Sequence, residues 1–409
     1  MNIKVIKWIF GLALFSKSYY VMALDTGNTQ YLIKPSGQYR VAYKDQYIVN
    51  NGLCPDKIYQ KGINESSFSN NKYCHEVLIR TYYPTQDKFK HDDNYYSPYL
   101  HEANKYYVKT YKLSESESTL LNSILSVQTY MLKDVHPIPK KRFPVLLFLP
   151  GSGQSTFTYN NIISNLVSHG YVVVGINSVF ASGPIKILNG NIVSWLESYN
   201  DNSRLENLDD LSFILNNIKP IFRNSQLKDV IDYNNIGLIG HSMGAMNIVY
   251  YLNNNVRKNI KMTILMDPGN IFNFYPNNKN YPIDIPNIPT MLIWSSNFKV
   301  NMHGSMKAYR TSFEVTLSPD LAIESNFTNH ENFSDLSTLQ YSPAYMIPKL
   351  HNAFLEPKNS TLGNGNGVEV AKTINSYMIL FTDYYMKNIH SKALMDCYKI
   401  TNSEVKCGK

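Results

Sequence analysis

Apolar runs that alternate with segments of helical spacing are the feature that most constrains the fold of this chain. Three such runs, rich in aliphatic residues, lie at 143–149, 171–176 and 235–240. They lack the polar alternation of a half-exposed strand and are typical of strands buried on both faces of a parallel sheet. Segments with helical spacing follow them at 159–169, 204–222 and 243–252. The alternation predicts an α/β fold, with a mostly parallel central sheet and helices on both faces.

The same pattern divides the rest of the chain. Further strands are expected at 77–84, 262–266, 290–294 and 321–324, and further helices at 117–132 and 370–387. The polar segment 24–75 shows few periodic apolar positions, and the polar, Tyr-rich segment 85–115 is expected to be a loop. We therefore expect one catalytic domain over 24–388, which begins with a polar extension (24–75) and is followed by a tail, 389–409.

Composition and charge exclude some classes of protein. Of the 409 residues 44% are hydrophobic and 17% are charged, which is too apolar a composition for a disordered chain. The formal net charge is +8, but the basic residues are scattered along the chain. A nucleic-acid-binding protein needs a dense basic stripe. No nucleic-acid partner is predicted.

Residues 1–23 have the pattern of an export signal. Lys4 and Lys7 precede a short apolar stretch, and small or β-branched residues stand near Ala23. The stretch is too short to span a bilayer, which takes about 20 residues. We expect a cleaved signal peptide and a secreted or periplasmic protein; an N-terminal anchor or a buried helix is the alternative.

The cysteines form two sequence-local pairs, one near each end of the chain: Cys54, Cys74, Cys397 and Cys407. In an exported protein two disulfides are expected. Three pairings are open, and Cys54–Cys74 with Cys397–Cys407 is the one that closes the shortest loops. Four free thiols in a reducing compartment are the alternative.

The pentapeptide Gly240-His241-Ser242-Met243-Gly244 stands between a predicted buried strand and a predicted apolar helix. A serine at such a strand-to-helix turn adopts a strained backbone, and side chains in place of the flanking glycines would collide with neighbouring chain. We predict that Ser242 is a catalytic nucleophile. A glycine-rich turn with a helix-capping serine is the alternative.

A serine nucleophile needs a base and an acid, which follow it in that type of site in the order serine, acid, histidine. Asp267, directly after the predicted strand 262–266, is the expected acid and ranks above Asp284 and Asp320. His330 is the expected base and His351 the second choice. Two other downstream histidines rank lower because one follows a strand too closely and the other lies near the tail: His303 and His390.

Two backbone N–H groups must stabilise the oxyanion of such a reaction. We expect one from Met243, directly after the nucleophile, and one from Ser152 in the loop Pro150–Gly153. This chemistry needs no cofactor. No His or Cys repeats at the spacing of zinc ligands, so no metal site is predicted.

These residues resemble the platelet-activating-factor acetylhydrolase family. The similarity lies in the pentapeptide, in Met266-Asp267 and in the run His330-Glu331-Asn332-Phe333-Ser334-Asp335. Looser similarity covers Leu78–Pro84 and Ser168–Val173, within about 76–388. The oxyanion loop departs from the pattern because Pro150 stands where the family tends to have His.

The resemblance implies an α/β-hydrolase fold and Ser242, Asp267 and His330 as triad. It also implies calcium-independent hydrolysis of a short or oxidised acyl chain at the second position of a phospholipid. A small-molecule ester or phospholipid is thus the expected substrate. Two alternatives stay open: a general short-chain carboxylesterase or polyester hydrolase, and a catalytically inactive binding protein on the same fold.

Surface helices of related enzymes touch lipid, and the segment 117–132, with Leu120, Leu121 and Ile124, is the candidate counterpart here. An ordinary helix that faces the core is the favoured interpretation of this segment. The sequence leaves open whether residues 183–203 fold over the site as a lid.

Overall fold

The computed structural model describes residues 32–50, 75–88, 98–123, 127, 129–179, 181–188, 190, 192–193, 201–255, 258–268, 288–297, 313–317, 327–339, 362–363, 365–391 and 405–406. Several features named above lie outside these ranges: the segment 1–23, the strand at 321–324, the four cysteines, Asp284, His303, Asp320 and His351. The expectations about them stay predictions.

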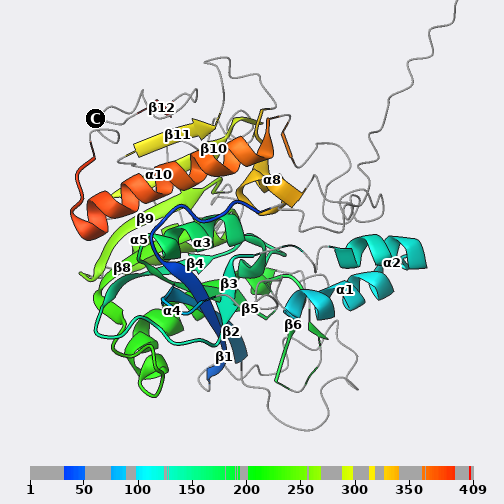
Figure 1. Cartoon of the computed structure of the whole chain (residues 1–409), viewed down its shortest axis with the longest axis horizontal. Coiled ribbons are helices and arrows are strands. Elements are labelled where there is room, and N and C mark those ends of the chain that lie inside the picture. The colour runs from blue at the N-terminus through cyan, green and yellow to red at the C-terminus, as the bar shows by residue number, and fades with distance from the viewer. Residues whose placement is uncertain are drawn as a thin grey trace, which may run out of the picture.

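A ten-stranded sheet forms the centre of the described structure (Figure 1). In chain order its strands are β1 (Arg40–Asn50), β2 (His75–Thr85), β3 (Met131–Lys133), β4 (Phe143–Leu149), β5 (Val172–Ser178), β8 (Ile231–His241), β9 (Ile260–Met266), β10 (Thr290–Ser295), β11 (Phe313–Leu317) and β12 (Val405–Lys406). Across the sheet they lie in the order β12-β11-β10-β9-β8-β4-β5-β2-β1-β3. The central strands from β11 to β5 are parallel, whereas the pairs β12–β11, β5–β2 and β2–β1 are antiparallel. The predicted α/β-hydrolase fold with a mostly parallel sheet is confirmed.

Helices cover both faces of this sheet. One face carries α4 (Asp201–Phe222) and α5 (Met243–Asn254), and the other carries α3 (Asn160–Ser168) and α10 (Gly367–Lys387). The strand β4 serves both cores, because Leu147 packs among the residues of α4 and α5 while Leu146 and Phe148 pack toward α3 and α10. Burial on both faces is the reason for the continuous apolar runs in the sequence.

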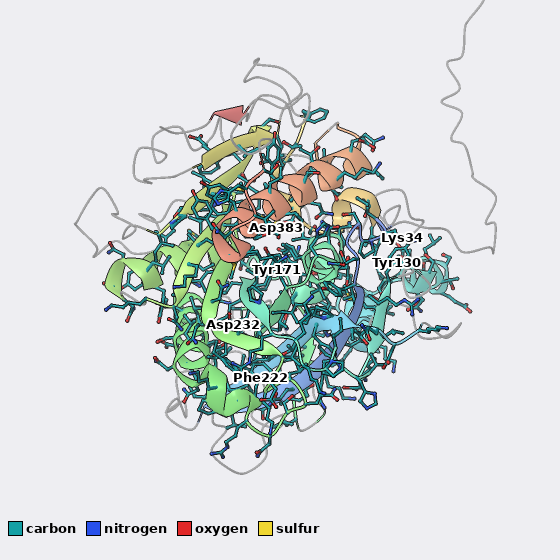
Figure 2. All side chains as sticks on the ribbon, turned by 60° about the vertical axis from the view of Figure 1, so that its left-hand side comes forward. Lys34, Tyr130, Tyr171, Phe222, Asp232 and Asp383 are labelled. Atoms are coloured by element: carbon teal, nitrogen blue, oxygen red, sulfur yellow. The ribbon has the colours of Figure 1, made fainter. Side chains whose placement is uncertain are left out.

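Polar contacts fasten α10 to the sheet near the start of β5. The hydroxyl of Tyr171 donates to Oδ1 of Asp383 at 2.6 Å. Lys387 donates to the same carboxylate at 2.9 Å and to the carbonyl oxygen of His169 at 2.6 Å. Figure 2 labels Tyr171, which directly precedes β5, and Asp383 of α10. This attachment lies at the amino ends of the parallel strands, opposite to the end that carries the pentapeptide.

Two polar segments in which no strand or helix was predicted contain regular structure. Within 24–75, β1 is a full member of the sheet and pairs with β2 along its whole length. Its polar Asp45 accepts a bidentate pair of hydrogen bonds from buried Arg80 at 2.6 and 2.8 Å, and the guanidinium lies 4.2 Å from the ring centroids of Tyr43 and Phe157. The sequence does not predict this strand, because a charged residue such as Asp45 finds its hydrogen-bonding partner on a neighbouring strand of the sheet.

Within 85–115 the structure has the helix α1 (Pro98–Thr110), where the sequence suggested a loop. The predicted helix 117–132 is also wrong in its extent: α2 spans Glu115–Asn122, and residues 131–133 form β3 beside β1. A capping box between Ser114 and Glu117 fixes the start of α2.

The leucines proposed for lipid contact lie against α1. Leu121 is buried, and it forms one cluster with Leu120, with Tyr107 of α1 and with Tyr111, which directly follows α1. The two helices lie side by side at one edge of the molecule (Figure 1). This packing agrees with the favoured interpretation of an ordinary core-facing helix for this part of the segment. In the described ranges, no helix combines the length and the apolar character of a membrane span.

The segment 183–203, considered above as a lid, is described only in part. It contains a short antiparallel pair, β6 (Ile185–Lys186) and β7 (Ile192–Val193), and its last residues already belong to α4. Its beginning lies against the loop after β4, because Gly153 N–H donates to Ala181 O at 2.9 Å and Gly183 N–H to Gln154 O at 3.2 Å.

Candidate active site

Ser242 lies at the sharp turn between β8 and α5, at the carboxyl edge of the sheet. Its backbone angles are φ 53° and ψ −119°, a region that a non-glycine residue rarely adopts and that costs about 1–3 kcal/mol. Its N–H donates to Met266 O at 2.9 Å and its carbonyl oxygen accepts from Met246 N–H at 3.1 Å. The turn is thus held in its strained form from β9 and from α5.

The two glycines of the pentapeptide leave room for this turn. A Cβ on Gly240 would lie 2.6 Å from the backbone nitrogen of Ala245, and a Cβ on Gly244 would lie 2.4 Å from Leu149 O. Both obstacles are backbone atoms, so no rotation of a side chain relieves them. The close approach of β4, β8 and α5 therefore demands glycine at both positions.

Asp267 follows the last residue of β9, in a positive-φ conformation (φ 40°), and is fully buried. Its Oδ1 accepts from the N–H of Ser295 at 2.7 Å, and its Oδ2 accepts from the hydroxyl of Ser295 at 2.5 Å. Ser295, the last residue of β10, was not singled out in the sequence because its role exists only through pairing of β10 with β9. These donors stabilise a buried carboxylate.

His330 opens the 3₁₀ helix η7 (His330–Phe333) and reaches both other residues. Its Nε2 lies 2.8 Å from Oγ of Ser242, and its Nδ1 lies 3.2 Å from Oδ2 of Asp267. The structure therefore brings together the three side chains that the sequence predicted as nucleophile, acid and base. Such a chain of contacts suits proton transfer from a serine hydroxyl.

The surroundings of His330 favour its charged form. Burial lowers the pKa of His330, but the hydrogen bond to Asp267 and the charges of Asp267 and Glu331 outweigh burial, so the pKa lies above its ordinary value. Burial also raises the pKa of the neighbouring Glu331 carboxyl, although the charge of His330 opposes this. Gln154 of the loop after β4 donates to Glu331 at 3.0 Å. These surroundings stabilise the positive charge that His330 would gain as a base.

The residues after His330 hold its loop in place. Asn332 accepts from the N–H groups of Asn329 at 2.7 Å and of Gly363 at 3.0 Å. Asp335 is fully buried and accepts from the backbone N–H groups of Asn160 and Asn161, at 2.8 and 2.9 Å, at the start of α3. The run Asn-Phe-x-Asp thus joins the histidine loop to a helix on the same face of the sheet.

The loop after β4 lies close to Ser242. A Cβ on Gly151 would lie 3.4 Å from Cβ of Ser242. The N–H of Gly151 itself donates to Oη of Tyr159 at 3.2 Å. Within the described residues, the N–H groups of Ser152 and Met243 have no acceptor. The two N–H groups predicted for the oxyanion are therefore available.

Other sequence candidates do not join this cluster. His390 lies on the surface, 2.8 Å from the side-chain oxygen of Asn388. His351, Asp284 and Asp320 lie outside the described ranges. Among the residues that the structure places, no group of three or more His, Cys, Asp or Glu side chains has the arrangement of a metal site.

Known proteins similar to this chain agree with its fold. A ferulic acid esterase from Streptomyces cinnamoneus superimposes with a TM-score of 0.62 at 19% identity, over 89% of this chain and 95% of the esterase. At this identity the likeness shows the fold alone. No curated protein sequence matches the chain significantly.

A family model does match most of the chain. The model of platelet-activating factor acetylhydrolase, isoform II, covers residues 30–182 and 192–356, which include Ser152, Ser242, Asp267 and His330. The match confirms the resemblance found in the sequence. Family and fold together support an ester hydrolase with a serine nucleophile. The chain belongs to the platelet-activating factor acetylhydrolase family, isoform II.

Proposed function

We propose that the chain hydrolyses carboxylic esters through a triad of Ser242, His330 and Asp267, and that short or oxidised acyl chains of phospholipids are its substrates. The observation that carries the triad is the pair of contacts made by His330, 2.8 Å to Ser242 Oγ and 3.2 Å to Asp267 Oδ2. The lipid preference is supported by membership in the family.

The contacts of His330 with Ser242 and Asp267 support the following acylation step. Oγ of Ser242 attacks the ester carbonyl carbon while Nε2 of His330 takes its proton. Asp267 stabilises the resulting imidazolium through Nδ1. The N–H groups of Met243 and Ser152 donate to the oxyanion of the tetrahedral intermediate. The imidazolium then protonates the leaving oxygen as the carbon–oxygen bond breaks, and the alcohol departs, which for a phospholipid is the lysophospholipid.

Deacylation reverses these roles. A water molecule attacks the acyl-serine carbonyl and gives its proton to His330. Collapse of the second tetrahedral intermediate releases the carboxylic acid and returns the proton to Ser242. No step requires a metal ion or a cofactor.

Labelling by a fluorophosphonate tests the nucleophile. We expect stoichiometric labelling of the wild-type protein at Ser242, none of Ser242→Ala, and normal labelling of Ser376→Ala, since Ser376 is an exposed serine of α10. Folded wild-type protein that takes no label would refute the serine mechanism and favour an inactive binding protein.

Acyl-chain length tests the substrate class. Turnover of p-nitrophenyl acetate, p-nitrophenyl palmitate and a phosphatidylcholine with a short second acyl chain should be compared on the same preparation. We expect high turnover of the short-acyl phospholipid and of the acetate, and low turnover of the palmitate. Equal rates on all three would remove the short-chain preference. Turnover of the acetate without the phospholipid would favour a general carboxylesterase.

A further inference from the structure

A chain of buried polar contacts runs beneath the nucleophile and is not used by the triad. The N–H of Gly151 donates to Oη of Tyr159 at 3.2 Å, and Oη of Tyr159 lies 2.8 Å from Nδ1 of His241. Tyr159 is fully buried and His241 is 1% exposed. The chain therefore connects the loop over Ser242 with the residue that directly precedes Ser242.

The direction of these hydrogen bonds is determined by the groups involved. A backbone N–H only donates, so Tyr159 Oη accepts from Gly151. Among the described residues Tyr159 Oη has one other partner, Nδ1 of His241, and its proton points there. Burial holds the pKa of the Tyr159 hydroxyl well above its usual value. His241 thus accepts at Nδ1, as a neutral imidazole with its proton on Nε2.

The ring of His241 lies against the catalytic base. Its centroid is 4.5 Å from that of His330, at an interplanar angle of 39°, and 5.4 Å from that of Phe333. Burial and the neighbouring charge of His330 lower the pKa of His241 well below its usual value. A neutral ring is the compatible neighbour for an imidazolium, because two like charges at this distance would oppose each other.

A side chain at Gly151 would fit tightly in this arrangement. A Cβ there would lie 3.1 Å from Nδ1 of His241 and 3.5 Å from Oη of Tyr159. The loop backbone thus rests directly on the Tyr159–His241 pair. Ser152, the expected oxyanion donor, is the next residue along this loop.

We propose that Tyr159 and His241 are positioning residues, which set the oxyanion loop relative to Ser242 by holding Gly151 and which keep a neutral ring beside His330. This inference rests on the proposed ester hydrolysis. Its consequence is that the Tyr159 hydroxyl contributes to stabilisation of the transition state without touching the substrate.

Tyr159→Phe removes that hydroxyl and keeps the ring, which packs 4.9 Å from the ring of Phe148. With p-nitrophenyl acetate, we expect kcat per titrated active site to fall about 10- to 100-fold, with KM nearly unchanged, because a donor displaced by about 1 Å costs on this order. The inhibition constant of an alkylboronic acid, a mimic of the tetrahedral intermediate, should rise by the same factor.

The matched control is Tyr171→Phe. Tyr171 is also buried, and it loses a hydrogen bond of 2.6 Å to Asp383 at the opposite end of the sheet (Figure 2). This variant should unfold at a lower temperature but keep the kcat and the boronate affinity of the wild type. An equal loss of boronate affinity in both variants would show a general effect of lost stability and overturn the inference.

A double-mutant cycle tests whether the two residues act as a unit. His241→Phe should reproduce the loss of Tyr159→Phe, and the double variant should be no worse than either single variant. His241→Asn, whose amide oxygen can accept near the place of Nδ1, should recover most of the activity. Additive losses, or a Tyr159→Phe variant with normal kcat and boronate affinity, would overturn the positioning role.

The outcome for the wild-type protein separates this inference from the proposed function. If fluorophosphonate labels Ser242 of the wild-type protein, but the Tyr159 and His241 variants have normal kcat and boronate affinity, the positioning role alone is wrong. If the wild-type protein takes no label, both are wrong.

Discussion

Replacement of Asp335 by alanine should strongly destabilise the protein, although Asp335 is not a member of the proposed triad and lies five residues from His330. One carboxylate oxygen accepts from the backbone N–H and the side-chain amide of Asn160, both at 2.8 Å. The other accepts from the N–H of Asn161 at 2.9 Å. Asp335 is therefore the acceptor for the first turn of α3, supplied from a loop that is distant in the sequence.

The magnitude follows from these donors. The amide of Asn160 also contacts Phe157 O at 2.6 Å, so it keeps a partner when Asp335 is removed. The two backbone N–H groups are left buried, at about 1–3 kcal/mol each. Loss of a negative charge at a helix start adds up to about 2 kcal/mol in a buried setting. With some relief by water entry, we expect a loss of about 3–5 kcal/mol.

Urea denaturation of Asp335→Ala and of Asp335→Asn measures this loss. Asn keeps one acceptor oxygen and should lose roughly half as much. The control is Glu369→Gln, which removes a half-exposed ion pair with Lys372 on α10 and should change stability by less than about 0.5 kcal/mol. A loss below about 1 kcal/mol in Asp335→Ala would refute the argument that this carboxylate joins the histidine loop to α3.

Three further predictions concern the site itself. His330→Ala should lower kcat by about 10⁴-fold or more with p-nitrophenyl acetate; if His351→Ala does so instead, the assignment of the base is wrong. Burial lowers the pKa of His330, but Asp267 and Glu331 raise it above its ordinary value, so kcat/KM should rise with pH through that pKa. Glu331→Gln should shift this rise to lower pH, and an unchanged pH profile would contradict the role of its charge. Gly244→Ala places a methyl group 2.4 Å from the last carbonyl oxygen of β4 and should cost at least about 2 kcal/mol in urea denaturation; wild-type stability would disprove the steric argument.

Elements whose signal is local could be predicted from the sequence. The buried strands β4, β5 and β8 appear as apolar runs, and α3, α5 and α10 appear through their spacing. The strand β1 and the helix α1 could not be predicted in this way. The polar residues of β1, such as Asp45, are satisfied by partners like Arg80 on another strand, and nothing in a local window shows such a partner.

The same division holds within the site. Ser242, Asp267 and His330 could be chosen from the sequence because each follows or precedes a recognisable element and their order along the chain is constrained. Ser295 and Tyr159 could not, because Ser295 acts through Asp267, 28 positions away, and Tyr159 acts through its contact with His241, 82 positions away. A serine at a strand end and a tyrosine before a helix carry no signal of their own.

The sequence by itself determined the α/β architecture, the place of the candidate nucleophile at a strand-to-helix turn and the chain order of the candidate acid and base. Periodicity and the glycines of the turn depend on residues that are close along the chain, so the sequence exposes them. The tertiary structure decided the length of α2, the place of β1 in the sheet, and the buried contacts of Asp335 and of the Tyr159–His241 pair. Those features depend on which distant segments come into contact. A buried polar side chain stabilises the fold only where the tertiary structure supplies its hydrogen-bonding partner.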